Sequence, residues 1–513
     1  MNDDQSRTVA FLMQSSTYGQ RGPVERMETH ISQIFLVGER AYKLKRAVKL
    51  PYADFSTCAL RLAACEKEIA LNSRTAPDLY LGVRRINRDG SGRMSLDGEG
   101  VTIDAVVEMK RFEQECLFDR MAIAGRLTPA LMTDLAGEIA RFHQSAPVVH
   151  AESGSANMRG VLDVNAAGFA TSHIFDAHMI EAFDERFRSV LDGHRDLLDH
   201  RAKAGMVRRC HGDLHLRNIC LLDGRPQLFD CIEFNDRIAT VDVLYDIAFL
   251  LMDLWHRDLP AFANLVMNRY LDETGDEDGF VLLPFFMAVR AAVRAHVTAT
   301  QAETAGSGKD ELTRQARSYF DLALALLGTV SPRLFAIGGL SGSGKTTVAE
   351  TLAPMVGAPP GARIIESDRI RKAMFGVLPE TRLGAEAYRP EISAAVYREL
   401  CSRSRAVAAD GGAVIADAVF DKPQNRAMVE KAARDAGVPF MGIWLDAEPA
   451  VLRKRVAGRK GGPSDADLTV LESQLRQDAG EIHWKRVLAG DSVNTIIKAI
   501  LGREQESDQA GLR

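Results

Sequence analysis

The segment Leu334–Thr347, LFAIGGLSGSGKTT, decides the fold of the last third of this 513-residue chain. It fits the pattern G-x-x-x-x-G-K-[ST], in which a glycine-rich loop turns its backbone N–H groups around phosphate and the lysine adds a positive charge. The apolar run 334–337 predicts a buried strand entering the loop, and residues 347–352 predict the helix leaving it. The sequence therefore predicts a phosphate-binding loop, with an ordinary Gly/Ser turn as the structural alternative.

Eight residues of this loop are expected to hold the nucleotide. They are Gly339, Ser341, Gly342, Ser343, Gly344, Lys345, Thr346 and Thr347. The hydroxyl of Thr346 is also expected to ligate magnesium, since a serine or threonine after the lysine takes that role in such loops.

Alternating strands and helices follow the loop. Strand-like runs at 363–365, 413–416 and 440–445 are separated by helical patterns at 391–409 and 423–436. This order predicts a parallel sheet covered by helices.

Three carboxylates fall at or just after the predicted strand ends, where such sheets bind their ligands. Asp368 is expected to accept a proton from a substrate hydroxyl, with Arg371 one turn away to hold an anionic group. Asp417 is expected to act on magnesium or on the substrate, and Asp446 is the third. Capping of the following helices is the structural alternative for each of them.

A group of basic residues lies beyond the third carboxylate. Arg455 and Arg459 share a helix face, and Gly461-Gly462-Pro463 then ends the helix. We interpret them as a mobile lid that stabilises charge on the transferring phosphate. With the Walker loop, the segment 367–371 and Ser464-Asp465-Ala466, this region resembles P-loop kinases of the gluconate kinase, polynucleotide kinase and zeta-toxin group.

The middle of the chain holds another phosphotransfer motif, His211-Gly212-Asp213-Leu214-His215-Leu216-Arg217-Asn218. Runs at 219–222 and 227–229 predict a hairpin across Asp223-Gly224, which would bring Asp213, Asn218 and Asp230 together. Phosphoryl transfer needs a carboxylate to accept the hydroxyl proton and further oxygen ligands for the metal. Asp213 suits the first role, and Asn218 and Asp230 suit the second. Simple turn and strand-end capping is the structural alternative.

These residues, with the segments 228–230 and 242–248, resemble the aminoglycoside phosphotransferase family, a branch of the protein-kinase-like fold. The resemblance implies that Asp213 is the catalytic base, that Asn218 and Asp230 bind magnesium, and that Asp246 steadies the loop. A small sheet lobe is expected before a larger helical lobe, with two strands at 34–37 and 40–44 and a helix at 59–73.

The same resemblance implies that Lys43 reaches the phosphates of ATP, with Glu68 as its partner. Lys45 shares the strand face of Lys43, and Glu66 competes with Glu68. No G-x-G-x-x-G lid is present, and Cys231-Ile232 follows Asp230 where protein kinases carry Phe-Gly. Both departures are typical of small-molecule kinases.

The composition is that of a globular chain, with 46% hydrophobic and 26% charged residues. No apolar run approaches the roughly 20 residues that span a bilayer, and the N-terminus is acidic where a secretory signal is basic. Seven cysteines without a C-x-x-C pair argue against a disulfide framework or a zinc site. We expect a cytoplasmic protein. A net charge of −5 gives no general attraction for nucleic acid.

The predicted organisation is an N-terminal extension (1–24), an α+β protein-kinase-like bilobal domain (25–328), an α/β P-loop NTPase domain with a parallel sheet (331–501), and a flexible tail (502–513). Each domain is expected to transfer phosphate from ATP to a hydroxyl with Mg²⁺, and the acceptor of the first is a small molecule. Two alternatives stay open: one domain regulates the other by binding nucleotide, or the P-loop domain phosphorylates a nucleic-acid 5′ end. Substrate identity and oligomeric state do not follow from the sequence.

Overall fold

The computed structural model describes residues 3–50, 53–150, 153–304, 306, 308–458 and 462–502. The chain forms two compact units. Unit 1 comprises Met1–Thr171 and Phe175–Asp253, and unit 2 comprises Ser172–Ile174 and Leu254–Arg513. The motif at 211–218 lies in unit 1 and the P-loop lies in unit 2.

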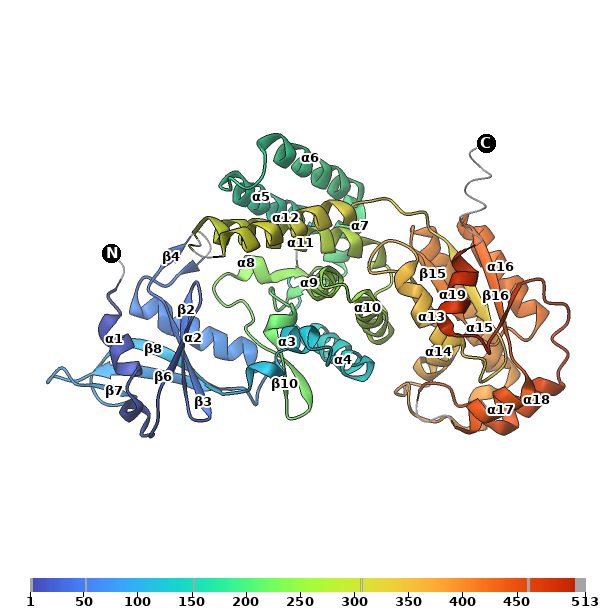
Figure 1. The fold of residues 1–513 in the computed structure, drawn as a ribbon, viewed down its shortest axis with the longest axis horizontal. Coiled ribbons are helices and arrows are strands. Elements are labelled where there is room, and N and C mark those ends of the chain that lie inside the picture. Colours follow the sequence, from blue (N-terminus) through green and yellow to red (C-terminus); the bar gives the residue numbers. More distant parts are fainter. Residues whose placement is uncertain are drawn as a thin grey trace. The chain divides into compact units, whose positions relative to one another are not determined.

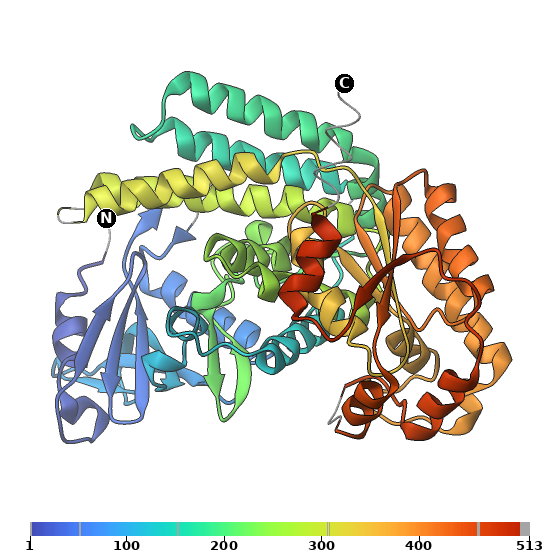
Figure 2. The ribbon, with the colours of Figure 1, turned by 45° about the vertical axis from the view of Figure 1, so that its right-hand side comes forward.

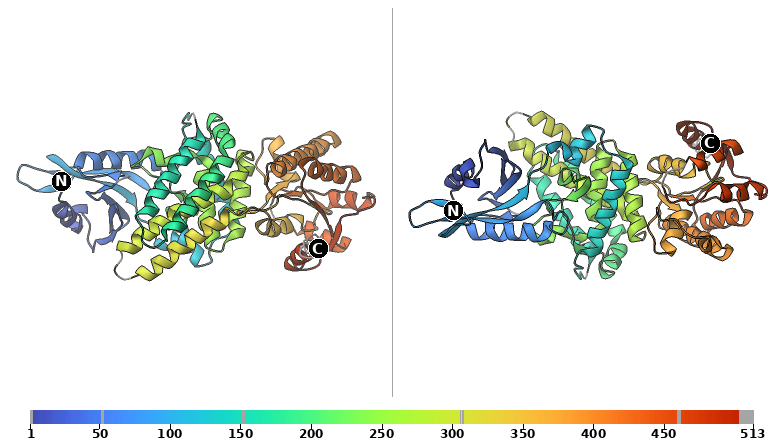
Figure 3. Two further views of the ribbon diagram at one scale, coloured as in Figure 1. Left: turned by 90° about the horizontal axis from the view of Figure 1, so that it is seen from above. Right: turned by 90° about the horizontal axis from the view of Figure 1, so that it is seen from below.

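An antiparallel sheet begins unit 1 (Figure 1). Its strands, in spatial order, are β1 (Glu25–Glu28), β2 (Ser32–Val37), β3 (Arg40–Lys45), β8 (Val101–Lys110), β6 (Tyr80–Arg88) and β7 (Met94–Leu96). Alternate side chains face opposite sides of a strand, so each face has its own core. Phe35 and Val37 pack with Leu12 of α1 (Ser6–Leu12), whereas Leu36 packs with Cys65 of α2 (Cys58–Asn72). Figure 3 shows α2 running along the sheet.

The rest of unit 1 is mainly helical. Its helices are α3 (Phe118–Ile123), α4 (Pro129–Ser145), α5 (Gly154–Ala170), α6 (Ala177–Gly193), α7 (Arg195–Lys203), α8 (Asp236–Ala239) and the start of α9 (Val243–His256). The short strands β9 (Val207–Arg209) and β12 (Thr240–Asp242) pair with each other, as do β4 (Lys49–Leu50) and β5 (Ala53–Asp54). A sheet lobe followed by a helical lobe confirms the expectation for this part of the chain.

The predicted hairpin is also confirmed. Strands β10 (Ile219–Leu222) and β11 (Arg225–Leu228) pair antiparallel across Asp223-Gly224. Both turn residues have positive φ, +51° and +78°, which is the backbone that a two-residue hairpin turn requires.

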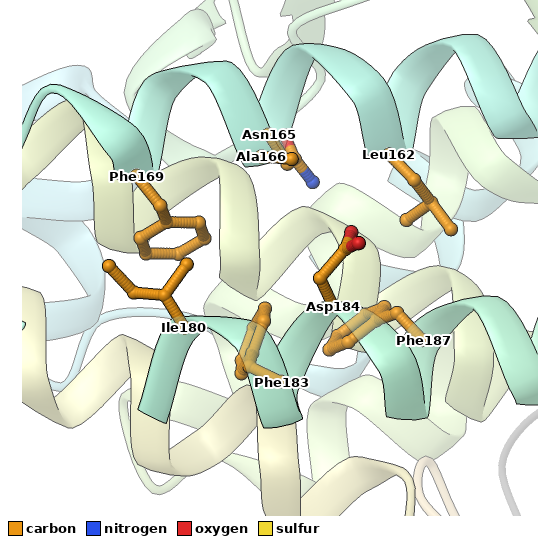
Figure 4. A pocket seen from close by; sticks show the side chains of 8 residues that line it. All are labelled: Leu162, Asn165, Ala166, Phe169, Ile180, Phe183, Asp184 and Phe187. Atoms are coloured by element: carbon orange, nitrogen blue, oxygen red, sulfur yellow. The ribbon is translucent and has the colours of Figure 1, made fainter. Parts of the chain in front are cut away.

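A small cavity of about 10 Å³ lies between α5 and α6, which is room for about one water molecule (Figure 4). Phe169, Phe183 and Phe187 line it together with Asn165 and Asp184.

Unit 2 begins with three helices, α10 (Pro260–Thr274), α11 (Leu283–Thr304) and α12 (Lys309–Leu326). Figure 2 shows α11 and α12 side by side. Among the described residues, one segment, Phe280–Glu303, is long and apolar enough to cross a membrane, and its 18-residue apolar window is 67% buried inside the protein. Such burial is typical of a core helix.

A parallel sheet of five strands forms the P-loop part of unit 2, in the order β14 (Arg363–Glu366), β15 (Val414–Asp417), β13 (Leu334–Gly338), β16 (Phe440–Asp446) and β17 (Lys485–Leu488). Its helices are α13 (Lys345–Leu352), α14 (Ser367–Met374), α15 (Pro390–Ala409), α16 (Pro423–Ala436), α17 (Pro449–Ala457), α18 (Leu468–Arg476) and α19 (Val493–Leu501). Phe335 and Ile337 share one core with α13 and α19, while Leu334 and Ala336 of the same strand are fully buried on the opposite face. Burial of both faces explains the continuous apolar run at 334–337.

These two architectures confirm the predicted fold class, a kinase-like domain followed by an α/β P-loop domain with a parallel sheet. Short 3₁₀ helices complete the described elements: η1 (Ser15–Tyr18), η2 (Gln114–Cys116), η3 (Leu216–Asn218), η4 (Phe280–Leu282), η5 (Ala353–Met355) and η6 (Ala385–Tyr388). The predicted tail lies outside the described residues except for Gly502.

Candidate active sites

The loop before β10 brings Asp213 and Asn218 together. Asn218 Nδ2 donates to Asp213 Oδ2 over 2.8 Å and to the Asp213 carbonyl over 2.9 Å. The Asp213 side chain is 39% exposed, and His215 Nε2 lies 3.4 Å from its Oδ2. Phe229 N donates to the Asn218 carbonyl over 3.0 Å, which places the next residue, Asp230, beside this pair.

Asp246 binds the backbone of the loop at His211 and Gly212. From the first turn of α9, its carboxylate accepts hydrogen bonds from the backbone N–H groups of His211 (3.1 Å) and Gly212 (2.8 Å). Gly212 has φ of +86°, and a Cβ atom there would lie 2.9 Å from Ala239 Cβ. The loop therefore needs both the buried carboxylate and the glycine at this point.

The ring of His211 fixes the other side of the loop. Burial lowers the pKa of His211, so the ring is neutral at pH 7. Its Nε2 lies 2.9 Å from the Phe229 carbonyl and its Nδ1 lies 3.3 Å from Asp213 N. These partners assign the proton to Nε2, which donates to the carbonyl while Nδ1 accepts from the backbone.

Lys43, Glu68 and Asp230 form one charged group. Lys43 Nζ lies 2.8 Å from Glu68 Oε1 and 2.5 Å from Asp230 Oδ1. Asp230 has φ of +66°, a strained backbone for a residue with a side chain, and its N–H donates to the Tyr80 hydroxyl over 3.1 Å. The structure thus places the expected metal ligand Asp230 against the expected phosphate-binding Lys43.

Lys45 and Glu66, the alternatives to Lys43 and Glu68, make other contacts. Lys45 is fully buried and binds the second carboxylate oxygen of Glu68 and also Glu233. Glu66 is exposed and lies 3.3 Å from Arg85. Of the two glutamates, Glu68 is therefore the partner of Lys43.

Charge pairing outweighs burial in this group. Burial lowers the pKa of Lys43. The carboxylates of Asp230 and Glu68 raise it by more than burial lowers it, so the pKa is well above its ordinary value. Burial raises the pKa of Glu68, and the ammonium groups of Lys43 and Lys45 bring it down to about 2. Lys43 and Glu68 are therefore both charged at pH 7, and the site holds an ammonium group for an anionic ligand.

In unit 2, the P-loop runs from β13 into α13 with Gly339, Gly342 and Gly344 at φ of +143°, +87° and +92°. A Cβ atom on Gly339 would lie 2.8 Å from the Leu445 carbonyl, and one on Gly342 would lie 3.0 Å from the Leu452 carbonyl. The loop can follow this path only with glycine at these positions.

Lys345 and Thr346 begin α13, followed by the exposed Thr347. Lys345 Nζ lies 3.4 Å from the Leu340 carbonyl, and the Thr346 hydroxyl donates to Asp417 Oδ2 over 2.8 Å. Burial raises the pKa of Asp417 to about 6, although Lys345 and Thr346 act in the opposite direction. The predicted metal pair, Thr346 and Asp417, is in contact.

Asp368 lies half-buried in the first turn of α14, one turn before Arg371. The guanidinium of Arg371 donates to the Ala387 carbonyl over 2.5 Å and stacks over the Tyr388 ring at 4.7 Å. At the end of β16, Asp446 accepts from the Trp444 indole over 3.0 Å.

The described part of the lid touches the P-loop. Arg455 donates to the Ala489 carbonyl over 2.8 Å, and its other terminal nitrogen lies 3.5 Å from the carbonyls of Gly342 and Ser343. Arg459 lies outside the described residues.

Sequence reasoning missed two residues near the P-loop. Glu366 ends β14 directly opposite Asp417 in the strand register, and burial, followed by the charge of Asp417, raises its pKa to about 8. Gln474 of α18 accepts the backbone N–H of Ser341 over 2.9 Å. Glu366 could have been found from its position at the end of a predicted strand. No local pattern in the sequence marks Gln474.

Two family models match this chain. The "Phosphotransferase enzyme family" matches residues 116–280, and the "AAA domain" matches residues 334–478. A shikimate kinase of Symbiobacterium thermophilum is 35% identical over 123 residues, which cover 24% of this chain and 62% of that protein. The crystal structure of a choline/ethanolamine kinase family protein from Mesorhizobium loti is 14% identical with a TM-score of 0.40, and it covers 63% of this chain and 95% of that one.

The similarity to one curated relative spans both units. The uncharacterized protein Rv2004c of Mycobacterium tuberculosis is 30% identical over 465 residues, which cover 89% of this chain and 90% of that protein. Both domains are of kinase or phosphotransferase type. The chain therefore belongs to the family of this mycobacterial protein, and it joins an aminoglycoside-phosphotransferase-like domain to a P-loop kinase domain.

Proposed function

We propose that this enzyme is a bifunctional kinase, in which each domain transfers the γ-phosphate of ATP to a hydroxyl group with the help of Mg²⁺. The observation that carries the proposal is the convergence of Asp213, Asn218, Asp230 and Lys43 in unit 1. This set combines a proton acceptor, two oxygen ligands and a phosphate-binding cation.

In unit 1, Asp213 accepts the proton of the attacking hydroxyl while Asn218 holds one of its carboxylate oxygens. Asn218 and Asp230 offer side-chain oxygens of the kind that magnesium prefers. Magnesium bound there would neutralise charge on the triphosphate. Lys43 turns from Asp230 to the phosphates when nucleotide binds, and its contact with Glu68 keeps the ammonium in place.

In unit 2, the backbone N–H groups of the P-loop and the Lys345 ammonium bind the phosphates. Thr346 and Asp417 hold magnesium, and Asp368 accepts the proton of the acceptor hydroxyl. Arg455, with Arg459, offsets the charge that develops on the transferring phosphate.

A small molecule is the favoured acceptor in unit 2 as well. The similarity to a shikimate kinase supports it. Next to the lid, Arg453 already pairs with Glu472 at 2.6 Å, which reduces the positive charge offered to a nucleic acid. A nucleic-acid 5′ end as acceptor would make acceptor binding fall steeply with added salt, whereas a small acceptor with at most one or two charges gives a much shallower response.

The test is to offer γ-labelled ATP and a broad metabolite pool to the wild type, Asp213→Asn and Lys345→Ala proteins. Two independent kinases predict that each substitution abolishes a different phosphorylation. Loss of all transfer with one substitution would show coupled sites or a single catalytic domain. Catalysis that persists in Lys345→Ala with altered ATP affinity would show that the P-loop domain regulates the other.

A further inference from the structure

Helix α10 packs against the β14 edge of the P-loop sheet. Strand β14 is the last strand on its side of the sheet, so one row of its backbone groups faces away from β15. Asn268 Oδ1 accepts the N–H of Ile364 over 2.7 Å, and Asn264 Nδ2 donates to the Ala362 carbonyl over 3.0 Å. Two asparagines of α10 thus replace the missing neighbouring strand.

The same helix and the segment after it supply the acid partners of two arginines. Arg363 is 1% exposed, and its guanidinium lies 2.6 Å from Asp272 and 2.9 Å from Glu277. Glu277 also pairs with Arg403 of α15. Buried charges keep their place only when they are paired and hydrogen-bonded, so these contacts fix α10 and the segment after it on the sheet.

One branch of this network leads to the proposed metal site. Asp272 Oδ2 lies 3.4 Å from Arg369 Nε, which in turn lies 3.0 Å from Glu366 Oε2. Glu366 stands opposite Asp417 in the strand register, and Asp417 accepts the Thr346 hydroxyl. A continuous chain of contacts therefore joins α10 to the start of the helix that follows the P-loop.

A second branch reaches that helix directly. Arg269 of α10 lies 2.6 Å from Glu350 of α13 and 3.3 Å from Asp272. Helix α10 falls within residues 116–280, the range matched by the phosphotransferase family model. The P-loop site is thus braced by a helix from outside the range matched by its own family model.

We propose that Asp272 is a positioning residue for the P-loop reaction: it orients Arg369 against Glu366 and thereby fixes the strand neighbour of Glu366, Asp417, which with Thr346 would hold the magnesium of bound nucleotide. The inference rests on the proposed nucleotide binding by the P-loop. Groups that hydrogen-bond a metal ligand typically change metal affinity by about 10–100-fold when they are removed, and Asp272, which acts through Arg369 and Glu366, should lie at the lower end.

The experiment is calorimetric titration of the full-length protein with AMP-PNP at a series of Mg²⁺ concentrations. Lys345→Ala identifies which binding event belongs to the P-loop. For that event, Asp272→Asn should raise the Mg²⁺ concentration needed for half-maximal affinity by about 10-fold. The matched control is Glu277→Gln. This substitution removes the acid partner that Arg363 and Arg403 share, but it leaves the contacts of Arg369 unchanged.

A different result is expected if Asp272 and Glu277 only stabilise the fold. Both variants would then lower the melting temperature and leave the Mg²⁺ dependence equal to that of the wild type, and this result overturns the inference. An equal rise of the Mg²⁺ requirement in Asp272→Asn and Glu277→Gln overturns it too. If Lys345→Ala retains every AMP-PNP binding event, the proposed function of the P-loop fails, and the inference fails with it.

Discussion

Replacement of Glu68 by glutamine should destabilise unit 1 by about 3 kcal/mol at pH 7. Glu68 is fully buried and shared by two ammonium groups, those of Lys43 and Lys45. Glutamine removes the negative charge and leaves both cations with one acid partner each. Loss of one member of a buried ion pair costs about 3–5 kcal/mol, and the remaining partners Asp230 and Glu233 favour the lower end.

The pKa of Glu68 gives the same magnitude. Its fall from 4.5 to about 2 on folding corresponds to about 3 kcal/mol of stability. Because the folded pKa is the lower one, this contribution is fully present above pH 4.5 and is lost as the pH falls toward 2. The difference between wild type and Glu68→Gln should therefore shrink from about 3 kcal/mol at pH 6 to about 2 kcal/mol at pH 3.5.

The assay is urea denaturation followed by circular dichroism and by tryptophan fluorescence. All three tryptophans (Trp255, Trp444 and Trp484) lie in unit 2, so fluorescence serves as an internal reference for the unit that is not mutated. The control is Glu66→Gln, which removes an exposed carboxylate worth at most about 1 kcal/mol. A Glu68→Gln protein that is as stable as Glu66→Gln at pH 6 would refute the reasoning.

Three further outcomes are expected in unit 2. Gly342→Ala forces a Cβ atom to 3.0 Å from Val456 Cγ2 at a φ of +87°, so calorimetry should show at least a roughly tenfold loss of Mg·AMP-PNP affinity; unchanged affinity would contradict the loop geometry. Asn268→Ala leaves the Ile364 N–H without its acceptor and should lower the unfolding free energy seen by tryptophan fluorescence by about 2–3 kcal/mol, whereas a change below about 1 kcal/mol would mean that the edge is not capped by this side chain. The Ser341 N–H donates to Gln474, so this bond, worth about 1 kcal/mol, must break before the N–H can bind phosphate. Gln474→Ala removes that cost and should raise nucleotide affinity about fivefold. A weaker complex would show that Gln474 contacts the nucleotide instead.

Elements whose residues interact locally could be predicted from the sequence. The hairpin at 219–228 follows from Asp223-Gly224 between apolar runs, and Asn218 contacts Asp213 only five residues away. The P-loop likewise lies between a strand and a helix that adjoin it in sequence. In each case the turn chemistry and the apolar period act over a few residues, so the chain itself carries the information.

The rest depends on contacts between distant residues. Asn268 meets Ile364 across 96 positions, and Gln474 meets Ser341 across 133. Nothing in the local sequence of α10 marks its asparagines and acids as partners of a distant strand. Only the register of β14 at the sheet edge gives those polar groups their partners.

The same distant contacts show that α10 belongs to the P-loop unit. A linker between independent domains carries few buried polar contacts, but here Asp272 and Arg363 are withdrawn from water together, and Arg363 is 1% exposed. Removal of Asp272 would leave the buried Arg363 with Glu277 as its acid partner, and loss of one partner of a buried charge costs more than the loss of an apolar contact of similar area. Helix α10 is therefore part of the fold of the P-loop unit, because its asparagine and acid side chains supply partners for the edge of the sheet, although the phosphotransferase family model also matches this helix.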